Sequence, residues 1–128
     1  MPDNEPDDLT DQLVSVCRTS VGDELRSITY FTADEAEQLY LRDDLEAGAD
    51  VVGFADNERL GFQTQQVYSD TELGDYRFII RVFDRGYLTR VIVGDHGAFV
   101  TTDEMEMDLF KELASAVESV LAEEDVEG

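Results

Sequence analysis

The apolar residues near the start of the chain recur at the spacing of an amphipathic helix. Leu9, Leu13 and Cys17 follow one another at intervals of four residues, beginning just after Asp7. Side chains spaced in this way share one face of an α-helix. Gly22 is well placed to end it. The pattern predicts a helix from Asp7 to Gly22, with Cys17 as a small buried apolar side chain.

A second and wider apolar stripe covers residues 105–121. Such width is typical of a helix that is buried on two sides or used at an interface. Two residue pairs ahead of the stripe fit a capping box, namely Thr101 with Glu104 and Asp103 with Glu106. The sequence therefore predicts a final helix that begins directly after one of these pairs.

Between the two helical stripes, β-branched and aromatic residues occur in short runs that fit strands. The runs predict five strands, at residues 24–32, 37–42, 76–83, 87–93 and 98–101. A polar turn separates the first two, so they are expected to form a hairpin. Tight turns rich in glycine and aspartate separate the last three.

The segment between the second and third strands is harder to interpret. Asp43 or Asp44 can cap a helix that Gly61 would end. Residues 62–75 fit either a short strand or a surface loop. The resulting element order is α-β-β-α-β-β-β-α. Consecutive strands joined by turns predict an α+β fold, in which a five-stranded antiparallel sheet carries helices on its faces.

The length of 128 residues is that of one ordinary domain with one hydrophobic core. Hydrophobic residues make up 42% of the chain, which argues against general disorder. We expect a disordered lead-in at residues 1–6, a single domain at residues 7–122 and an acidic tail at residues 123–128.

The charge of the chain is extreme, because 31 carboxylates and 9 cations give a formal net charge of −22. Lys111 is the single lysine, and the other eight cations are arginines. Such a charge opposes folding in dilute buffer, whereas a Debye length of about 3 Å at ~1 M salt screens most of the repulsion. The carboxylates are scattered along the whole chain, which disfavours a nucleic-acid mimic with one acidic face. The composition indicates the cytoplasm of a halophile that accumulates salt.

The same charge disfavours binding to nucleic acids or to anionic membranes, both of which attract clustered cations. No apolar run approaches the ~20 residues of a membrane span. The first residues, MPDNEPDDL, lack the positive and apolar regions of a secretion signal. The sequence predicts a cytoplasmic protein without nucleic-acid or membrane partners.

The sequence contains no recognisable catalytic or cofactor motif. Cys17 is the only cysteine, which excludes an intrachain disulfide and a paired-cysteine zinc site. His96 is the only histidine, and its setting in GDHG favours a polar turn. We expect no enzymatic activity, no metal site and no cofactor.

Half of the arginines lie on one predicted hairpin, at positions 77, 81, 85 and 90. If Arg85-Gly86 forms a two-residue loop, Arg81 falls opposite Arg90, and that face needs an anion. If Asp84-Arg85-Gly86 forms a three-residue turn with Gly86 at positive φ, Arg90 moves to the other face. The second register is favoured, because it requires a left-handed conformation only of glycine.

Arg77, Arg81 and Arg90 are therefore the candidate binding residues. Carboxylates of a neighbouring element or subunit can pair with them, since the guanidinium fork grips a carboxylate with two hydrogen bonds. The alternatives are a contact surface for a protein partner and a site for a small anion.

The order of the predicted elements resembles that of roadblock/LC7-type domains, whose five-stranded antiparallel sheet has one helix on one face and two on the other. A PAS- or profilin-like arrangement is the alternative. The segments LVSVCRT, ITYFT, EQLYLRDDL, TELGDYRFIIRVFDRGYLTRV and FVTTDEM resemble a family of small acidic haloarchaeal proteins, a domain of unknown function. This resemblance extends from about Asp8 to Leu121 and implies no catalytic residues.

These observations predict a non-catalytic adaptor or regulatory module that forms homodimers. The roadblock-like order places the 76–83 strand at an edge of the sheet, where two copies would pair, because an unpaired apolar edge usually needs covering. A PAS-like sensor that binds a small ligand or anion is the alternative function, and an unrecognised enzyme is a minor one.

Overall fold

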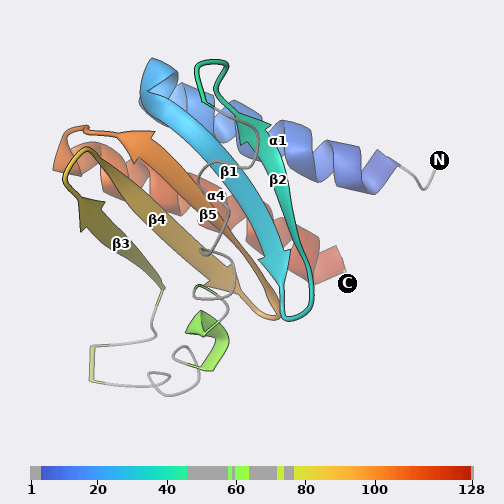
Figure 1. Ribbon diagram of the computed structural model, residues 1–128. Helices are drawn as coiled ribbons and strands as arrows, with labels where there is room; N and C mark the ends of the chain where they lie inside the picture. The colour runs from blue at the N-terminus through green and yellow to red at the C-terminus, as the bar shows by residue number, and fades with distance from the viewer. Residues whose placement is uncertain (1–3, 46–57, 59, 64–71, 74–76, 128) are drawn as a thin grey trace.

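Two helices lie side by side against one face of a five-stranded antiparallel sheet (Figure 1). The computed structural model describes residues 4–45, 58, 60–63, 72–73 and 77–127. The strand order in the sheet is β2-β1-β5-β4-β3. The elements are α1 (Asn4–Val21), the 3-10 turn η1 (Gly22–Glu24), β1 (Leu25–Thr32), β2 (Ala36–Leu41), β3 (Phe78–Phe83), β4 (Gly86–Val93), β5 (His96–Asp103) and α4 (Met107–Glu127). The predicted fold class is confirmed.

The first helix forms where the apolar period predicted it, but it begins earlier, at Asn4. Pro6 is compatible with this start, because the first N–H groups of a helix have no acceptor within the helix. Residues 4–6 therefore belong to α1 and not to a disordered lead-in. The helix ends at Val21, and Gly22 has a φ of 64°, a left-handed conformation that glycine adopts at little cost.

The last helix begins and ends later than the sequence predicted. Both capping-box predictions are wrong, because β5 continues as far as Asp103 and pairs with β1 on one side and β4 on the other. The helix starts at Met107 and continues to Glu127, through most of the expected acidic tail. Alanine and glutamate favour a helix there, and no glycine or proline interrupts the chain before Gly128.

The predicted hairpin of β1 and β2 is confirmed, with a register shift between Ile28 and Thr29. On its other side β1 pairs with β5, so that Ile28 lies opposite Val100. The first and last strands are thus neighbours inside the sheet. This arrangement leaves β2 and β3 at the two edges.

The hairpin of β3 and β4 has a register that the sequence did not predict. Phe83 pairs with Gly86, so the loop consists of Asp84 and Arg85 alone, and both predicted registers are wrong. Gly86 is part of β4 and does not take the left-handed bulge position. A Cβ on Gly86 would collide with the backbone carbonyl of Thr102, so close packing of β4 against β5 requires glycine here.

The hairpin of β4 and β5 gives the single histidine a buried place. Its loop is Gly94-Asp95, with Gly94 at a φ of 63°, and His96 is the first residue of β5 rather than part of a polar turn. The His96 Nδ1 lies 2.8 Å from the Tyr30 hydroxyl, and its Nε2 lies 3.1 Å from the Leu121 carbonyl oxygen. Because a carbonyl only accepts, Nε2 donates to Leu121, and in the neutral imidazole Nδ1 accepts from the Tyr30 hydroxyl.

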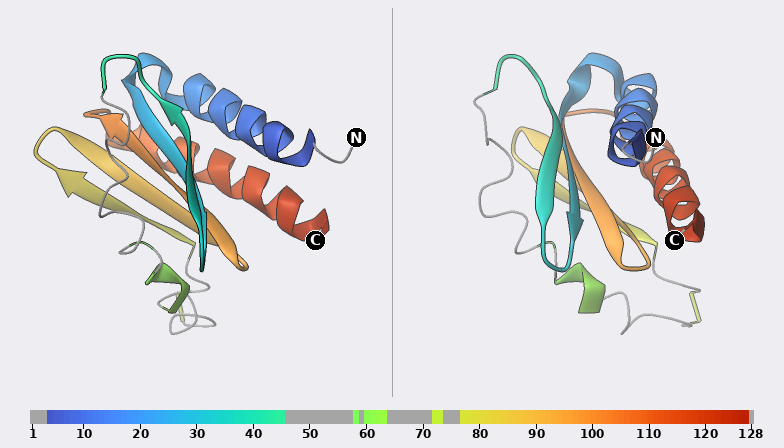
Figure 2. Two further views of the ribbon diagram at one scale, coloured as in Figure 1. Left: turned by 45° about the vertical axis from the view of Figure 1, so that its right-hand side comes forward. Right: turned by 90° about the vertical axis from the view of Figure 1, so that its right-hand side faces the viewer.

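The main core lies between the sheet and the helices α1 and α4, as the side view shows (Figure 2). Cys17 is fully buried in it, in agreement with the sequence analysis. Burial raises the pKa of the Cys17 thiol to about 12. The thiolate, which is the nucleophilic form, is therefore scarce at neutral pH, and Cys17 acts as an apolar side chain.

A smaller apolar cluster lies on the opposite face of the sheet. It consists of Phe31, Leu88, Ile92 and Phe99, and Phe62 packs against it. The ring centroids of Phe31 and Phe62 are 5.6 Å apart. Residues 58–63, as far as they are described, are thereby attached to the face that α1 and α4 leave open.

The predicted second helix falls mainly on residues 46–57, which lie outside the described residues. Residues 43–45 form a turn and a bend, Glu58 is helical, Leu60 lies in a turn and residues 61–63 are helical. The predicted end of the second helix at Gly61 therefore falls beside residues that are not described. Most of the 62–75 segment also lies outside the described residues.

Candidate interaction site at the edge strand

The strand β3 ends the sheet and exposes apolar side chains. Val82 and Phe83 are 64% and 50% exposed. Among the residues that the structure describes, no strand pairs with the outer side of β3. Since Phe83 and Gly86 close a two-residue loop, the alternation of an antiparallel ladder directs the N–H groups of Ile80 and Val82 away from β4. Such an apolar edge is a surface to which another strand can add.

A buried carboxylate joins two of the predicted arginines on the sheet face opposite the helices. The Glu58 Oε2 accepts a hydrogen bond of 2.8 Å from Arg81 Nε, and its Oε1 accepts one of 3.0 Å from Arg90 Nη1. Glu58 is 2% exposed and Arg90 is 4% exposed, whereas Arg81 is 40% exposed. We call these three residues the Glu58 cluster. It fixes residues 58–63 to β3 and β4.

The neighbours of the Glu58 cluster explain how the carboxylate reaches the sheet. A Cβ on Gly61 would collide with the Arg90 guanidinium and with Ile92, so glycine allows the backbone to lie directly over these side chains. Phe62 packs beside them on the smaller apolar cluster. Gly61, Ile92 and Phe62 thus lie on the side of the Glu58 cluster where Arg90 is buried, whereas Arg81 remains partly exposed.

Arg77 lies apart from the Glu58 cluster. It precedes β3, and its guanidinium forms a bidentate ion pair with Glu118 of α4, on the helix-covered face. Its Cζ also lies 5.0 Å from the centroid of the Phe78 ring, a cation–π contact. The side chain is 56% exposed, so the pair belongs to the protein surface.

The structure therefore brings two of the three predicted site residues together. Arg81 lies opposite Leu88, and Arg90 lies opposite Ile79, so the two arginines share a face as diagonal neighbours. The anion that such a face needs is supplied by Glu58 of the same chain. Sequence reasoning missed this residue. The available signal was its position four residues before Phe62, a spacing that places both on one side of a helical turn.

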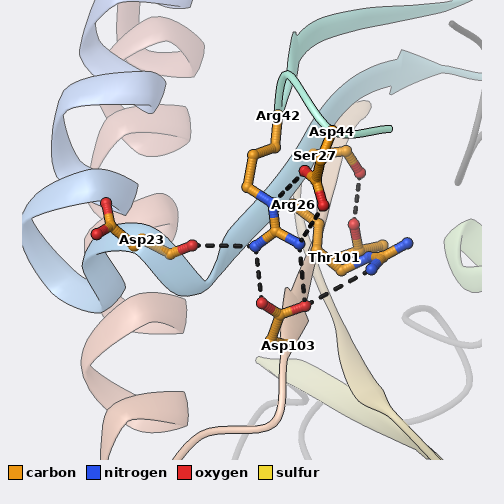
Figure 3. A network of polar contacts seen from close by, with 7 residues as sticks. All are labelled: Asp23, Arg26, Ser27, Arg42, Asp44, Thr101 and Asp103. Atoms are coloured by element: carbon orange, nitrogen blue, oxygen red, sulfur yellow. Dashed lines mark hydrogen bonds and ion pairs between the residues drawn. The ribbon is translucent and has the colours of Figure 1, made fainter. Parts of the chain in front are cut away.

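A second polar network ties the ends of β1, β2 and β5 together (Figure 3). Arg42 donates to both carboxylate oxygens of Asp103, at 2.7 and 3.3 Å, and to both of Asp44, at 2.6 and 3.3 Å. It also donates to the Asp23 carbonyl oxygen. Arg26 approaches Asp103 at 3.6 Å. One guanidinium thus crosslinks three segments that are distant in sequence.

The Arg42 guanidinium holds the pKa of Asp103 below its usual range through their hydrogen bonds. The ionised carboxylate therefore stabilises the fold above the ordinary aspartate pKa of about 3.9, and this contribution disappears as the pH falls through the lower native pKa. We expect Asp103→Asn to destabilise the protein at neutral pH, and the difference from the wild type to shrink in acid. Urea unfolding at a series of pH values checks this. Asp84→Asn, in the exposed loop, is the control, and a difference that grows in acid would contradict the prediction.

In the part of the chain that the structure describes, no group of three or more histidine, cysteine or acidic side chains is placed to hold a metal ion. None of its helices combines the length and the apolar character that a membrane crossing requires.

Residues 11–122 match the family model described as "Domain of unknown function (DUF7522)". The chain belongs to this family. The match covers most of the domain, including all five strands and most of both helices. A search of curated proteins finds no match.

Several solved structures have the same fold as this DUF7522 protein. The gliding protein MglB from Thermus thermophilus is 11% identical, with a TM-score of 0.64 and 93% of each chain covered. MglB with a tetrameric arrangement is 13% identical, with a TM-score of 0.63 and coverage of 93% of this chain and 92% of that chain. MglC from Myxococcus xanthus is 10% identical, with a TM-score of 0.53 and coverage of 90% and 98%. The fold is that of roadblock/LC7-type proteins, as the element order suggested.

Proposed function

We propose that this DUF7522 protein is a non-catalytic adaptor or regulatory module that forms a homodimer through the outer edge of β3. The observation that carries the proposal is the exposed apolar edge, where Val82 and Phe83 lie beside outward-directed backbone groups. Backbone groups at a sheet edge gain hydrogen bonds, and apolar side chains lose contact with water, when a second strand pairs with them.

A second copy of the chain is the occupant that fits this edge. Two antiparallel copies of one strand satisfy each other's backbone groups about a two-fold axis, which is the commonest symmetry of soluble oligomers. The two sheets would then form one continuous sheet.

The similar structures support an assembly role. One of them is MglB in a tetrameric arrangement, so a protein of this fold associates with itself. The likeness of the fold to MglB and MglC supports an interaction module.

Arg77 and Arg81 have roles at the rim of this interface. Both are partly exposed, and each already has a carboxylate partner that fixes its direction. An arginine held in this way can offer remaining N–H donors to a carboxylate of the second copy. Arg90 is buried, and Glu58 connects it to Arg81 of β3. Exposed ion pairs contribute about 0–1 kcal/mol each, so these arginines would determine orientation more than affinity.

The small-ligand sensor is less well supported as the primary function. An anion held between Arg77, Arg81 and Arg90 would favour it, whereas Arg81 and Arg90 converge on Glu58 and Arg77 pairs with Glu118. The acidic composition supports a halophilic archaeal cytoplasm as the setting of the module.

Replacing Ile80 with proline tests whether the outer edge of β3 pairs with the β3 strand of a second copy. Proline removes an N–H group that points away from β4, so the ladder between β3 and β4 keeps its hydrogen bonds while the outer edge loses a donor. We expect Ile80→Pro to weaken dimerisation by at least about tenfold, since losing one hydrogen bond and distorting the strand costs on the order of 1 kcal/mol or more. Sedimentation equilibrium at several protein concentrations measures the change.

Ile80→Ala is the matched control, because it removes the same side chain but keeps the backbone donor. Circular dichroism establishes that both variants are folded. If Ile80→Ala and Ile80→Pro weaken association equally, or if neither does, β3 does not pair with a second strand.

A further inference from the structure

A pocket of about 280 Å³ lies at the β3–β4 loop, distinct from the Glu58 cluster. Arg26 and Arg85 line it, together with Phe83, Gly86 and Thr101. Because Gly86 has no side chain, no side-chain atoms of this residue fill the space of the pocket. The Thr101 hydroxyl is hydrogen-bonded to Ser27 across β1 and β5, at 2.5 Å. The residues that line the pocket therefore include a threonine, an aromatic side chain and two arginines.

Arg85 differs from every other arginine that the structure describes. The remaining six described arginines, 18, 26, 42, 77, 81 and 90, each lie within 4.0 Å of a carboxylate oxygen. Arg85 has no such partner among the described residues, although the chain carries 31 carboxylates. An arginine without a partner in so acidic a protein indicates that its position serves something other than internal pairing.

The charges around the pocket are mixed. Arg26 approaches Asp103, but that carboxylate is also gripped on both oxygens by Arg42. Asp84 precedes Arg85 in the exposed loop. Asp103 is thus shared by the guanidinium groups of Arg26 and Arg42, and the described residues that line the pocket include two arginines and no carboxylate.

We propose that this pocket binds the oxyanion of a small ligand, a phosphate or a carboxylate group. Arg85 and Arg26 would donate to the oxygens, because the planar fork of arginine matches both groups. Phe83 would cover an apolar part of the ligand. A small ligand fits better than a nucleic acid, since the net charge of −22 repels a polyanion far more strongly than a monoanion or dianion. The proposal does not depend on dimerisation.

Titration with inorganic phosphate and, separately, with acetate tests the site and distinguishes the two oxyanions. Potassium chloride keeps the ionic strength constant, and backbone amide NMR shifts report binding. We expect saturable shifts centred on Gly86, Tyr87 and Thr102 with at least one of the two anions. Arg85→Ala should weaken this binding by at least about tenfold, as expected for loss of a charge-assisted bidentate contact.

Two further variants make the result specific. Arg85→Lys should restore only part of the affinity, because lysine keeps the charge but lacks the fork. Arg18→Ala removes the same charge from α1, which contributes no residue to the lining of the pocket, and should bind as the wild type does. Shifts that do not saturate with either anion, or equal binding by the wild type and Arg85→Ala, would overturn the proposal.

Discussion

Replacing Glu58 with alanine should destabilise the protein by about 3–5 kcal/mol, the cost typical of removing one partner from a buried ion pair. Arg90 is 4% exposed, and without Glu58 its guanidinium would remain buried with its main anion removed. Residues 58–63 would also lose their polar attachment to the sheet. Urea unfolding in concentrated KCl measures the loss, because urea is uncharged and leaves the ionic strength unchanged.

Glu118→Ala is the matched control. It also removes a glutamate that pairs with an arginine of the same hairpin region, but the Arg77–Glu118 pair is exposed and should contribute only about 0–1 kcal/mol. Glu58→Gln keeps the shape and one acceptor, and its loss should lie between the other two. Equal effects of Glu58→Ala and Glu118→Ala would show that the Glu58 cluster does not stabilise the fold as described.

Withdrawing salt should have the second large effect. At ~0.1 M KCl the Debye length is about 10 Å, so the 31 carboxylates repel one another across the surface, whereas at ~2 M the repulsion is almost fully screened. We expect the thermal midpoint to rise by at least about 10 °C between these concentrations, equivalent to roughly 2–3 kcal/mol for a domain of this size.

Sucrose separates screening from general stabilisation. It stabilises folded proteins by exclusion from their surface but does not screen charge. Adding it at low salt should therefore recover much less of the midpoint than KCl does. Equal midpoints at the two KCl concentrations would contradict the halophilic interpretation of the composition.

Much of the fold could be predicted from the sequence, because it depends on local patterns. The four-residue spacing of Leu9, Leu13 and Cys17 places them on one helix face, and all three are buried in the main core. Gly22 follows the last residue of α1 and has a left-handed φ, in agreement with the prediction that it ends the helix. The β1–β2 hairpin follows from two strand-like runs around a polar turn.

The errors arose where tertiary contacts outweigh local preferences. Thr101 and Asp103 fit a capping box, yet pairing of β5 on both sides keeps them in the sheet. Gly86 suggested a left-handed turn, whereas it is needed for the close approach of Thr102. His96 was expected in a turn, but Tyr30 and Leu121 provide buried partners from distant elements. No pattern within a short window contains such information.

The candidate site was predictable only in part. Only the less favoured of the two predicted registers put Arg81 and Arg90 on one face that needs an anion, and the structure, with a third register, places both beside Glu58. The identity of that anion depends on how residues 58–63 fold back onto the sheet. Arg85, by contrast, has no separate role in the sequence pattern, because the pocket that it lines is formed by residues of β1, β3, β4 and β5 that only the fold brings together.

The molar mass of the folded wild-type protein in solution tests the proposed homodimer most directly. Light scattering at ~100 μM protein in ~2 M KCl, where surface repulsion is screened, measures it without any mutation. A homodimer paired through β3 should have a mass close to twice the 14.4 kDa of one chain. A folded species with the mass of a single chain under these conditions would contradict it.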